Sequence, residues 1–194
     1  VQPFDIVETE DSLFVTEFGA DRIAELDPSG GRRGTFGTSG IGEANLLGPQ
    51  YLAYDGNGTL YVSDWGNARV CKFTTGGEFV QCFGESSDFF RGLAEPTGIV
   101  VQDERIYVAD AAQRAVFVFD ESGNLIREIS NVGLNHPEGL AEFDEEHLLV
   151  ADRGRLLLLN IADEVVSEFS DVTAYPGRVS AGAVDANQNL VATD

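Results

Sequence analysis

The sequence is poor in the residues that several classes of function require. It has no methionine, a single lysine (Lys72), two histidines and two cysteines. No apolar run approaches the ~18 residues that cross a membrane, so we expect no membrane span. Two histidines are too few for a histidine-rich zinc site.

Basic residues are also scarce, since 12 Lys and Arg face 33 Asp and Glu and give a formal net charge of −21. Nucleic acids are bound chiefly through cationic contacts to phosphate, so we expect no nucleic-acid partner. The acidic surplus suits cationic partners, divalent cations or solubility. An acidic, lysine-poor surface also occurs in proteins adapted to high salt, and this alternative stays open.

What the sequence does have is a repeat. Prolines recur at intervals of roughly 39 to 47 residues, namely Pro3, Pro49, Pro96, Pro137 and Pro176. After each come two apolar residues and a small one, as in Tyr61-Val62-Ser63. Short apolar runs joined by glycine turns, without a sustained helical period, predict four strands per unit. Units of ~40 to 50 residues with four strands are the blades of a β-propeller, an all-β fold.

The best-formed unit reads Pro96-Thr97-Gly98-Ile99, then Tyr107 to Asp110, Arg114, Phe119-Asp120 and Gly123. This pattern resembles the NHL repeat, and the resemblance covers essentially the whole chain. It implies a β-propeller, usually of six blades. The repeat arginines in this alignment are Arg22, Arg69, Arg114 and Arg155. When each turn is counted from its aspartate to its arginine, the turn after Asp110 is one residue shorter than the turn after Asp64. The turn after Asp152 is two residues shorter.

The repeat predicts one domain over residues 1–194, with blades at about 1–46, 47–94, 95–134 and 135–173 and a partial fifth at 174–194. Four blades and half of a fifth do not close a ring. Propellers avoid open sheet edges by closing on themselves. We therefore expect missing blades or another chain to complete the ring.

Ligands of propellers commonly bind at the end where the loop entering the first strand meets the turn between the second and third strands. We call this end the loop face. It collects the candidate ligand-binding residues Phe18, Trp65, Glu95, His136, Arg153 and Tyr175. Trp65 stands out because the other units carry Phe18, Ala111 and Arg153 in its place. A tryptophan at a loop tip is typical of a contact anchor, with packing against a neighbouring loop as the alternative.

An aspartate recurs at the start of the same turns, as Asp64, Asp110 and Asp152. Recurrence favours a structural carboxylate that accepts hydrogen bonds from the backbone or from the repeat arginine. The same three residues are the candidates for a metal site, because carboxylates and carbonyls across a channel suit calcium. We expect no other cofactor.

Cys71 and Cys82 flank the turn at residues 75–78. A two-residue hairpin at Gly76-Gly77 would set them directly opposite each other, at a separation suited to a disulfide. A longer loop would shift the register, and two reduced thiols remain the alternative. A bridge would favour an extracytoplasmic or secreted location.

The favoured function is a non-enzymatic module that binds a protein, peptide or glycan on the loop face, because binding needs only a rigid ring with variable loop tips. Residues 38–48 and 85–95 form the longest loops, and Phe89-Phe90-Arg91 is either a contact cluster or buried. The alternative is a metal-dependent propeller hydrolase or lyase, similar to lactonases or to the peptidyl-hydroxyglycine amidating lyase, whose several histidine ligands this chain lacks. A second alternative is a structural segment of a larger surface protein.

Overall fold

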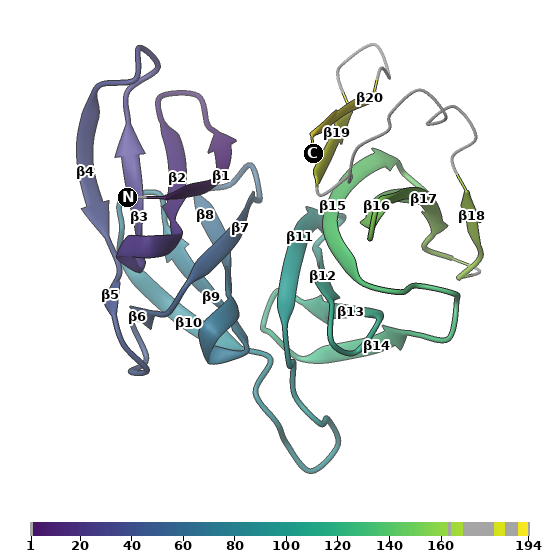
Figure 1. The fold of residues 1–194 in the computed structure, drawn as a ribbon. Coiled ribbons are helices and arrows are strands. Elements are labelled where there is room, and N and C mark those ends of the chain that lie inside the picture. Colours follow the sequence, from purple (N-terminus) through teal and green to yellow (C-terminus); the bar gives the residue numbers. More distant parts are fainter. Residues whose placement is uncertain (1, 163, 169–180, 185–189, 194) are drawn as a thin grey trace.

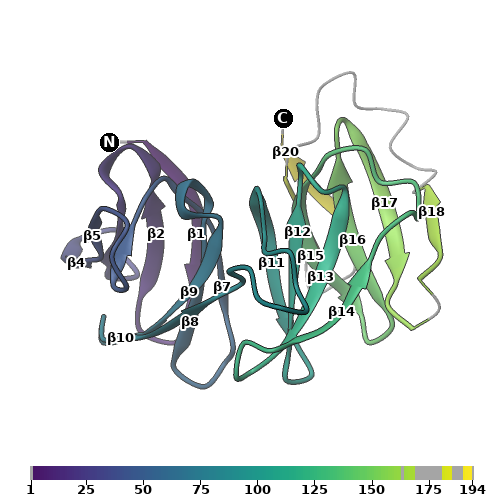
Figure 2. The same cartoon turned by 90° about the horizontal axis from the view of Figure 1, so that it is seen from below.

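The chain folds into four antiparallel sheets of four strands each, set side by side around an arc (Figures 1 and 2). The computed structural model describes residues 2–162, 164–168, 181–184 and 190–193. Each sheet is one blade, and a two-stranded sheet follows the fourth blade. The predicted all-β propeller is thereby confirmed.

The strands of each blade follow the chain order from the inner strand outward. Blade one contains β1 (Pro3–Glu8), β2 (Leu13–Glu17), β3 (Arg22–Leu26) and β4 (Arg32–Phe36). Blade two contains β7 (Pro49–Tyr54), β8 (Thr59–Asp64), β9 (Arg69–Thr74) and β10 (Phe79–Phe83). Blade three contains β11 (Pro96–Gln102), β12 (Arg105–Asp110), β13 (Ala115–Asp120) and β14 (Leu125–Ile129).

Blade four contains β15 (Pro137–Asp144), β16 (His147–Asp152), β17 (Arg155–Asn160) and β18 (Val166–Glu168). The two-stranded sheet pairs β19 (Ala181–Val184) with β20 (Leu190–Thr193). Between blades one and two, β5 (Thr38–Ser39) and β6 (Asn45–Leu46) form a short parallel pair. Two 3-10 turns, η1 (Phe18–Ala20) and η2 (Trp65–Asn67), join the second and third strands of blades one and two.

The repeat prolines mark the first residue of the inner strand in all four blades. Inner strands of successive blades touch, β1 with β7, β7 with β11, β11 with β15 and β15 with β19. Pro49 pairs with Asp64 and Pro96 with Asp110, so the proline end and the aspartate turn of a blade share one end of the sheet. This end is the loop face.

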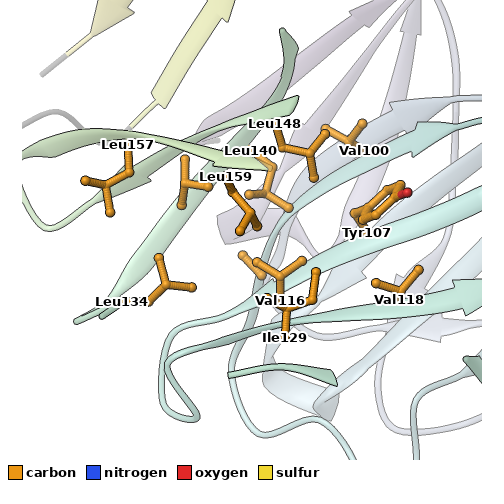
Figure 3. Close-up of a cluster of buried hydrophobic side chains, with 12 residues drawn as sticks. Val100, Tyr107, Val116, Val118, Ile129, Leu134, Leu140, Leu148, Leu157 and Leu159 are labelled. Atoms are coloured by element: carbon orange, nitrogen blue, oxygen red, sulfur yellow. The ribbon is translucent and has the colours of Figure 1, made fainter. Parts of the chain in front are cut away.

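Among the described residues the hydrophobic core forms three clusters, one between each pair of neighbouring four-stranded blades. Figure 3 shows the cluster between blades three and four, where Val116, Val118 and Ile129 face Leu157 and Leu159. A blade therefore buries each face only against a neighbour, which is why the repeat must stack to be stable.

Hydroxyl groups tie adjacent blades together at the small residue of the repeat. Thr16 on β2 donates to the carbonyl of Gln50 in blade two at 2.5 Å, and Ser63 on β8 donates to the carbonyl of Thr97 in blade three. Ala109 has no hydroxyl, and Thr97 on β11 instead donates to the carbonyl of Pro137 at 2.9 Å. The small residue thus allows close approach and, in two blades, also carries a buried hydrogen bond between blades.

Gly98 shows why the repeat opens with a glycine in blade three. A Cβ added there would lie 2.4 Å from the backbone nitrogen of Leu140 and 2.7 Å from the carbonyl carbon of Gly139. No side chain fits between β11 and β15 at that point, so glycine sets how closely the two inner strands pack.

Candidate functional site

The turn carboxylates hold the loops of the loop face in place. Asp64 is fully buried and accepts hydrogen bonds from the backbone of Leu47 at 2.7 Å, from Asn67 Nδ2 at 2.8 Å and from Arg69 Nε at 2.9 Å. Burial raises the pKa of the Asp64 carboxyl, against the lowering effect of these hydrogen bonds. Asp64 therefore joins the incoming loop, the turn and the third strand of blade two.

Asp110 and Asp152 play the same part in the next two blades. Asp110 accepts from the backbone of Ala94 at 2.7 Å and of Gln113 at 2.9 Å, and Asp152 accepts from the backbone of His136 at 2.6 Å and from Arg155. Each carboxylate serves its own blade. Within the described part of the chain, no three Asp, Glu, His or Cys side chains gather as a metal site would require.

The prediction that Arg114 is the repeat arginine of blade three is wrong. In the strand register Glu17 pairs with Arg22, Asp64 with Arg69 and Asp152 with Arg155, whereas Asp110 pairs with Ala115. The turn after Asp110 is therefore as long as the turn after Asp64, and not one residue short. Arg114 has a φ of 54°, and its counterpart in blade two is Ala68 with a φ of 53°.

An aromatic patch joins the two best candidates at the loop tips to two inner-strand residues. We define this patch as Phe4, Phe18, Tyr51 and Trp65. The ring of Phe18 lies 6.3 Å from Trp65 and 6.1 Å from Phe4, and Phe4 meets Tyr51 edge-on at 5.3 Å. Trp65 is 37% exposed and Phe4 47%. The patch therefore runs from the inner strands of blades one and two out to their loop tips.

Acidic groups border the inner end of the patch. Asp5, next to Phe4, accepts a hydrogen bond from the backbone of Leu52 at 2.8 Å, and burial raises its pKa. The pKa of Tyr51 is raised by burial and, to a smaller extent, by the charges of Asp5 and Glu138. An apolar surface with negative charge at one side suits a ligand that combines apolar and cationic groups.

Three other sequence-predicted residues lie over blades three and four and do not join the patch, namely Glu95, His136 and Arg153. The backbone of Glu95 donates to Asp110 at 3.2 Å. The His136 ring nitrogen Nδ1 lies 3.3 Å from Glu138 Oε1, and Arg153 is exposed with a φ of 48°. Tyr175 lies outside the described residues. Five of the six candidates are described by the structure. Among these five, it shows a direct contact only between Phe18 and Trp65.

Phe4 and Tyr51 were missed because inner-strand residues were assigned to the fold alone. Tyr51 stands where blades three and four have Gly98 and Gly139, and Phe4 stands where they have Thr97 and Glu138. Tyr51 departs from the Pro-x-Gly opening of the repeat, whereas Phe4 occupies its variable position. The departure at Tyr51 is a signal in the sequence that could have identified that residue.

The two phenylalanines in the loop at residues 85–95 have different environments. Phe90 packs in the core, with its ring 5.4 Å from Phe117 and 5.8 Å from Phe119. Phe89 is 97% exposed. Arg91 lies over the ring of Phe117 at 5.6 Å and pairs with Glu128 at 2.9 Å. Of the Phe89-Phe90-Arg91 cluster, Phe90 is therefore an anchor in the core and Phe89 is exposed surface.

A disulfide joins Cys71 and Cys82, which lie directly opposite each other on β9 and β10. The expected two-residue turn is absent. The backbone of Thr74 instead donates to the carbonyl of Glu78 at 2.8 Å across a longer loop, and a bulge between Phe79 and Gln81 restores the register. The bulge is what brings the two cysteines opposite each other.

Comparison with known proteins supports the propeller fold. A family model described as a 6-bladed beta-propeller matches residues 92–143. No curated protein matches the chain. No helix in the described part of the chain is long and apolar enough to cross a membrane.

Solved structures of different functions share this architecture. A chain from a crystal structure of the nidogen/laminin complex is 21% identical with a TM-score of 0.77, over 99% of this chain and 72% of that one. The inactive H270A virginiamycin B lyase from Staphylococcus aureus with quinupristin is 15% identical with a TM-score of 0.72, over 93% and 59%. Hydrazine synthase from Kuenenia stuttgartiensis is 18% identical with a TM-score of 0.67, over 86% and 48%. At these identities the likeness concerns the fold.

Proposed function

We propose that this chain is an NHL-type propeller module that binds a protein, peptide or glycan partner through its loop face, without catalysis. The observation that carries the proposal is the aromatic patch. Four aromatic residues from two blades form one surface, and the largest of them, Trp65, is partly exposed at a loop tip. Partly exposed aromatic side chains on a rigid scaffold are typical of interface anchors.

The acidic surroundings favour one chemistry for the partner. Asp5 and Glu138 border the patch, and the whole chain carries a net charge of −21. A segment with apolar side chains beside lysine or arginine would gain from both features. A likeness to a chain of the nidogen/laminin complex is consistent with a protein partner. The Cys71–Cys82 bridge supports an extracytoplasmic or secreted location, and missing blades or another chain would complete the ring.

The test uses a peptide library displayed on phage and selected against the protein. Synthetic copies of the enriched peptides are then titrated by calorimetry. Trp65 is the only tryptophan, so its fluorescence reports occupancy of the patch directly. Trp65→Ala should weaken binding by ~30-fold, since truncating an anchor residue costs about 2 kcal/mol.

Phe89→Ala is the matched control, because Phe89 is the most exposed large hydrophobic residue described and has no ring contact with the patch. It should leave the affinity within ~2-fold, as most residues outside an anchor contribute little. Peptides that bind Trp65→Ala as tightly as the wild type, or a selection that enriches none, would contradict the proposal.

A lyase or hydrolase activity is the second candidate, favoured by one feature of blade four. The His136 ring nitrogen Nδ1 lies 3.3 Å from Oε1 of the buried Glu138 near the inner end of the loop face, without a hydrogen bond between them, and an imidazole beside a carboxylate is a pair that general acid–base catalysis uses. Three of the structures of similar fold are virginiamycin B or streptogramin B lyases by their names. Mass spectrometry of quinupristin incubated with the protein, with and without a chelator, tests this candidate: linear product supports it, and intact quinupristin in both arms removes it.

A further inference from the structure

A second surface on the loop face has the opposite character to the aromatic patch. A pocket of about 510 Å³ opens over blade three. It lies among the loop entering blade three, the turn between β12 and β13, and the loop leaving β14. Its lining residues are Arg91, Gln113, Arg114, Glu128, Ser130, Asn131, Gly133 and Leu134.

The pocket lies beside the one described turn in which the repeat arginine is replaced. In blade two, Arg69 is buried and its guanidinium donates to the carbonyls of Gly42 at 2.6 Å and Asn45 at 3.0 Å, which ties down the incoming loop. Ala115 occupies the same register position in blade three. Here the amide of Gln113 reaches the incoming loop instead, donating to the carbonyl of Gly92 at 2.9 Å.

Losing that arginine leaves two other guanidinium groups at the pocket. Arg91 comes from the incoming loop and is held by Gln113 and by Glu128, the latter at 2.9 Å. Arg114 is exposed, and its guanidinium makes no hydrogen bond or ion pair with any residue that the structure describes. Two cations and one carboxylate give a locally positive lining on a chain of net charge −21.

We propose that this pocket binds a carboxylate group, with Arg114 as its principal ligand and Arg91 as the second. A guanidinium presents paired donors in a plane that matches a carboxylate. Arg91 is already oriented by Gln113 and Glu128, so little of its side-chain entropy remains to be lost on binding. Ser130 and Asn131 add polar groups at the rim. The site is independent of the aromatic patch and of the function proposed for it.

The carboxylate could belong to a free small acid or to an acidic side chain of a peptide. Both sources present the same group, so the test has one arm for each. Succinate is the probe in the first arm, with succinamide as its neutral counterpart. Acetyl-Ala-Glu-Ala-amide is the probe in the second arm, with its Gln analogue as the counterpart.

Binding is measured by isothermal titration calorimetry at constant ionic strength on the full chain. Arg114→Ala should weaken binding of the preferred probe by ~10-fold or more, because a hydrogen-bonded charge contact is lost. The backbone tolerates this change, since Ala68 adopts the same left-handed conformation in blade two. Arg105→Ala is the charge-matched control: Arg105 is exposed, begins β12 at the opposite end of the blade, and should leave the affinity unchanged.

Tighter binding of succinate or of the Glu peptide identifies the source of the carboxylate, and either result supports the site. Binding of the neutral counterparts at equal affinity, no binding of either acid, or an equal loss in Arg114→Ala and Arg105→Ala would overturn it. Trp65→Ala should leave succinate binding intact. Failure of the peptide selection at the aromatic patch is thereby separated from failure of this site.

Discussion

The loop face of blades one and two differs from that of blade three in almost every property that matters for recognition. Over blades one and two, four aromatic rings form a partly exposed apolar surface with acidic groups beside it. Over blade three, two arginines line a polar pocket. The two regions have the same strand order, and blades two and three have the same aspartate at the start of the turn, where blade one has Glu17.

The difference comes from positions where a blade departs from the repeat. Tyr51 replaces a glycine of the inner strand, Trp65 occupies a variable loop tip, and Ala115 replaces the arginine of the turn. The positions that repeat, such as Asp64 and Asp110, hold the loops by hydrogen bonds. Repeated residues therefore build the scaffold, and departures from the repeat give each blade its own surface.

The largest expected effect concerns the arginine that blade two has and blade three lacks. Arg69→Ala should lower the free energy of unfolding by about 3–5 kcal/mol, because it leaves the buried Asp64 carboxylate without its cation. Urea unfolding measures this loss. Arg105→Ala, an exposed arginine without an ion pair to a described residue, is the control and should change stability by less than ~0.5 kcal/mol.

Blade three also indicates how the stability lost in Arg69→Ala can be partly recovered. Gln113 donates through both its backbone and its side chain to Asp110, whereas Asn67 donates through its side chain to Asp64. Asn67→Gln added to Arg69→Ala should recover part of the stability. An Arg69→Ala variant as stable as the wild type would show that the two turns are held in the same way, and would remove the comparison.

A smaller expected effect is that the acidic groups of blades one and two make stability depend on pH in opposite ways. Hydrogen bonding from Arg32, with a lesser part from Arg22, holds the pKa of Glu17 below its usual range, whereas burial raises the pKa of Asp64. A lowered pKa stabilises the fold above the unfolded-state pKa of ~4.3, and this stability is lost as the pH falls through the folded-state pKa. A raised pKa acts in the opposite sense, since its contribution is present at low pH and lost as the pH rises.

The two signs predict opposite changes in the acid sensitivity of stability. Between pH 6 and pH 3.5, Glu17→Gln should lose less unfolding free energy than the wild type, and Asp64→Asn should lose more. Urea unfolding at the two pH values measures both variants. Changes of the same sign in the two variants would contradict the assigned directions.

The sequence was sufficient for the propeller because its signal is repeated: proline, paired apolar residues and aspartate recur in register and coincide with strand ends. Phe18 and Trp65 could be placed together for the same reason. Arg114 was misassigned because residue type was weighted above register, and Gln113 performs part of the arginine's role without resembling it. Phe4 and Tyr51 lie on inner strands, and only the three-dimensional packing shows that their rings reach the loop tips. The bulge that aligns the two cysteines has no marker in residue type.

The most direct test of the account is to restore the repeat arginine in blade three. Ala115→Arg places an arginine opposite Asp110, in the register that Arg69 occupies opposite Asp64. The measurement is a titration of the variant with the acid that the wild type binds more tightly, succinate or the Glu peptide, with the fold checked by circular dichroism. We predict a folded protein that no longer binds this acid, because the blade has been returned to the repeat. A folded variant that binds the acid with wild-type affinity would contradict the claim that departures from the repeat create the sites of the loop face.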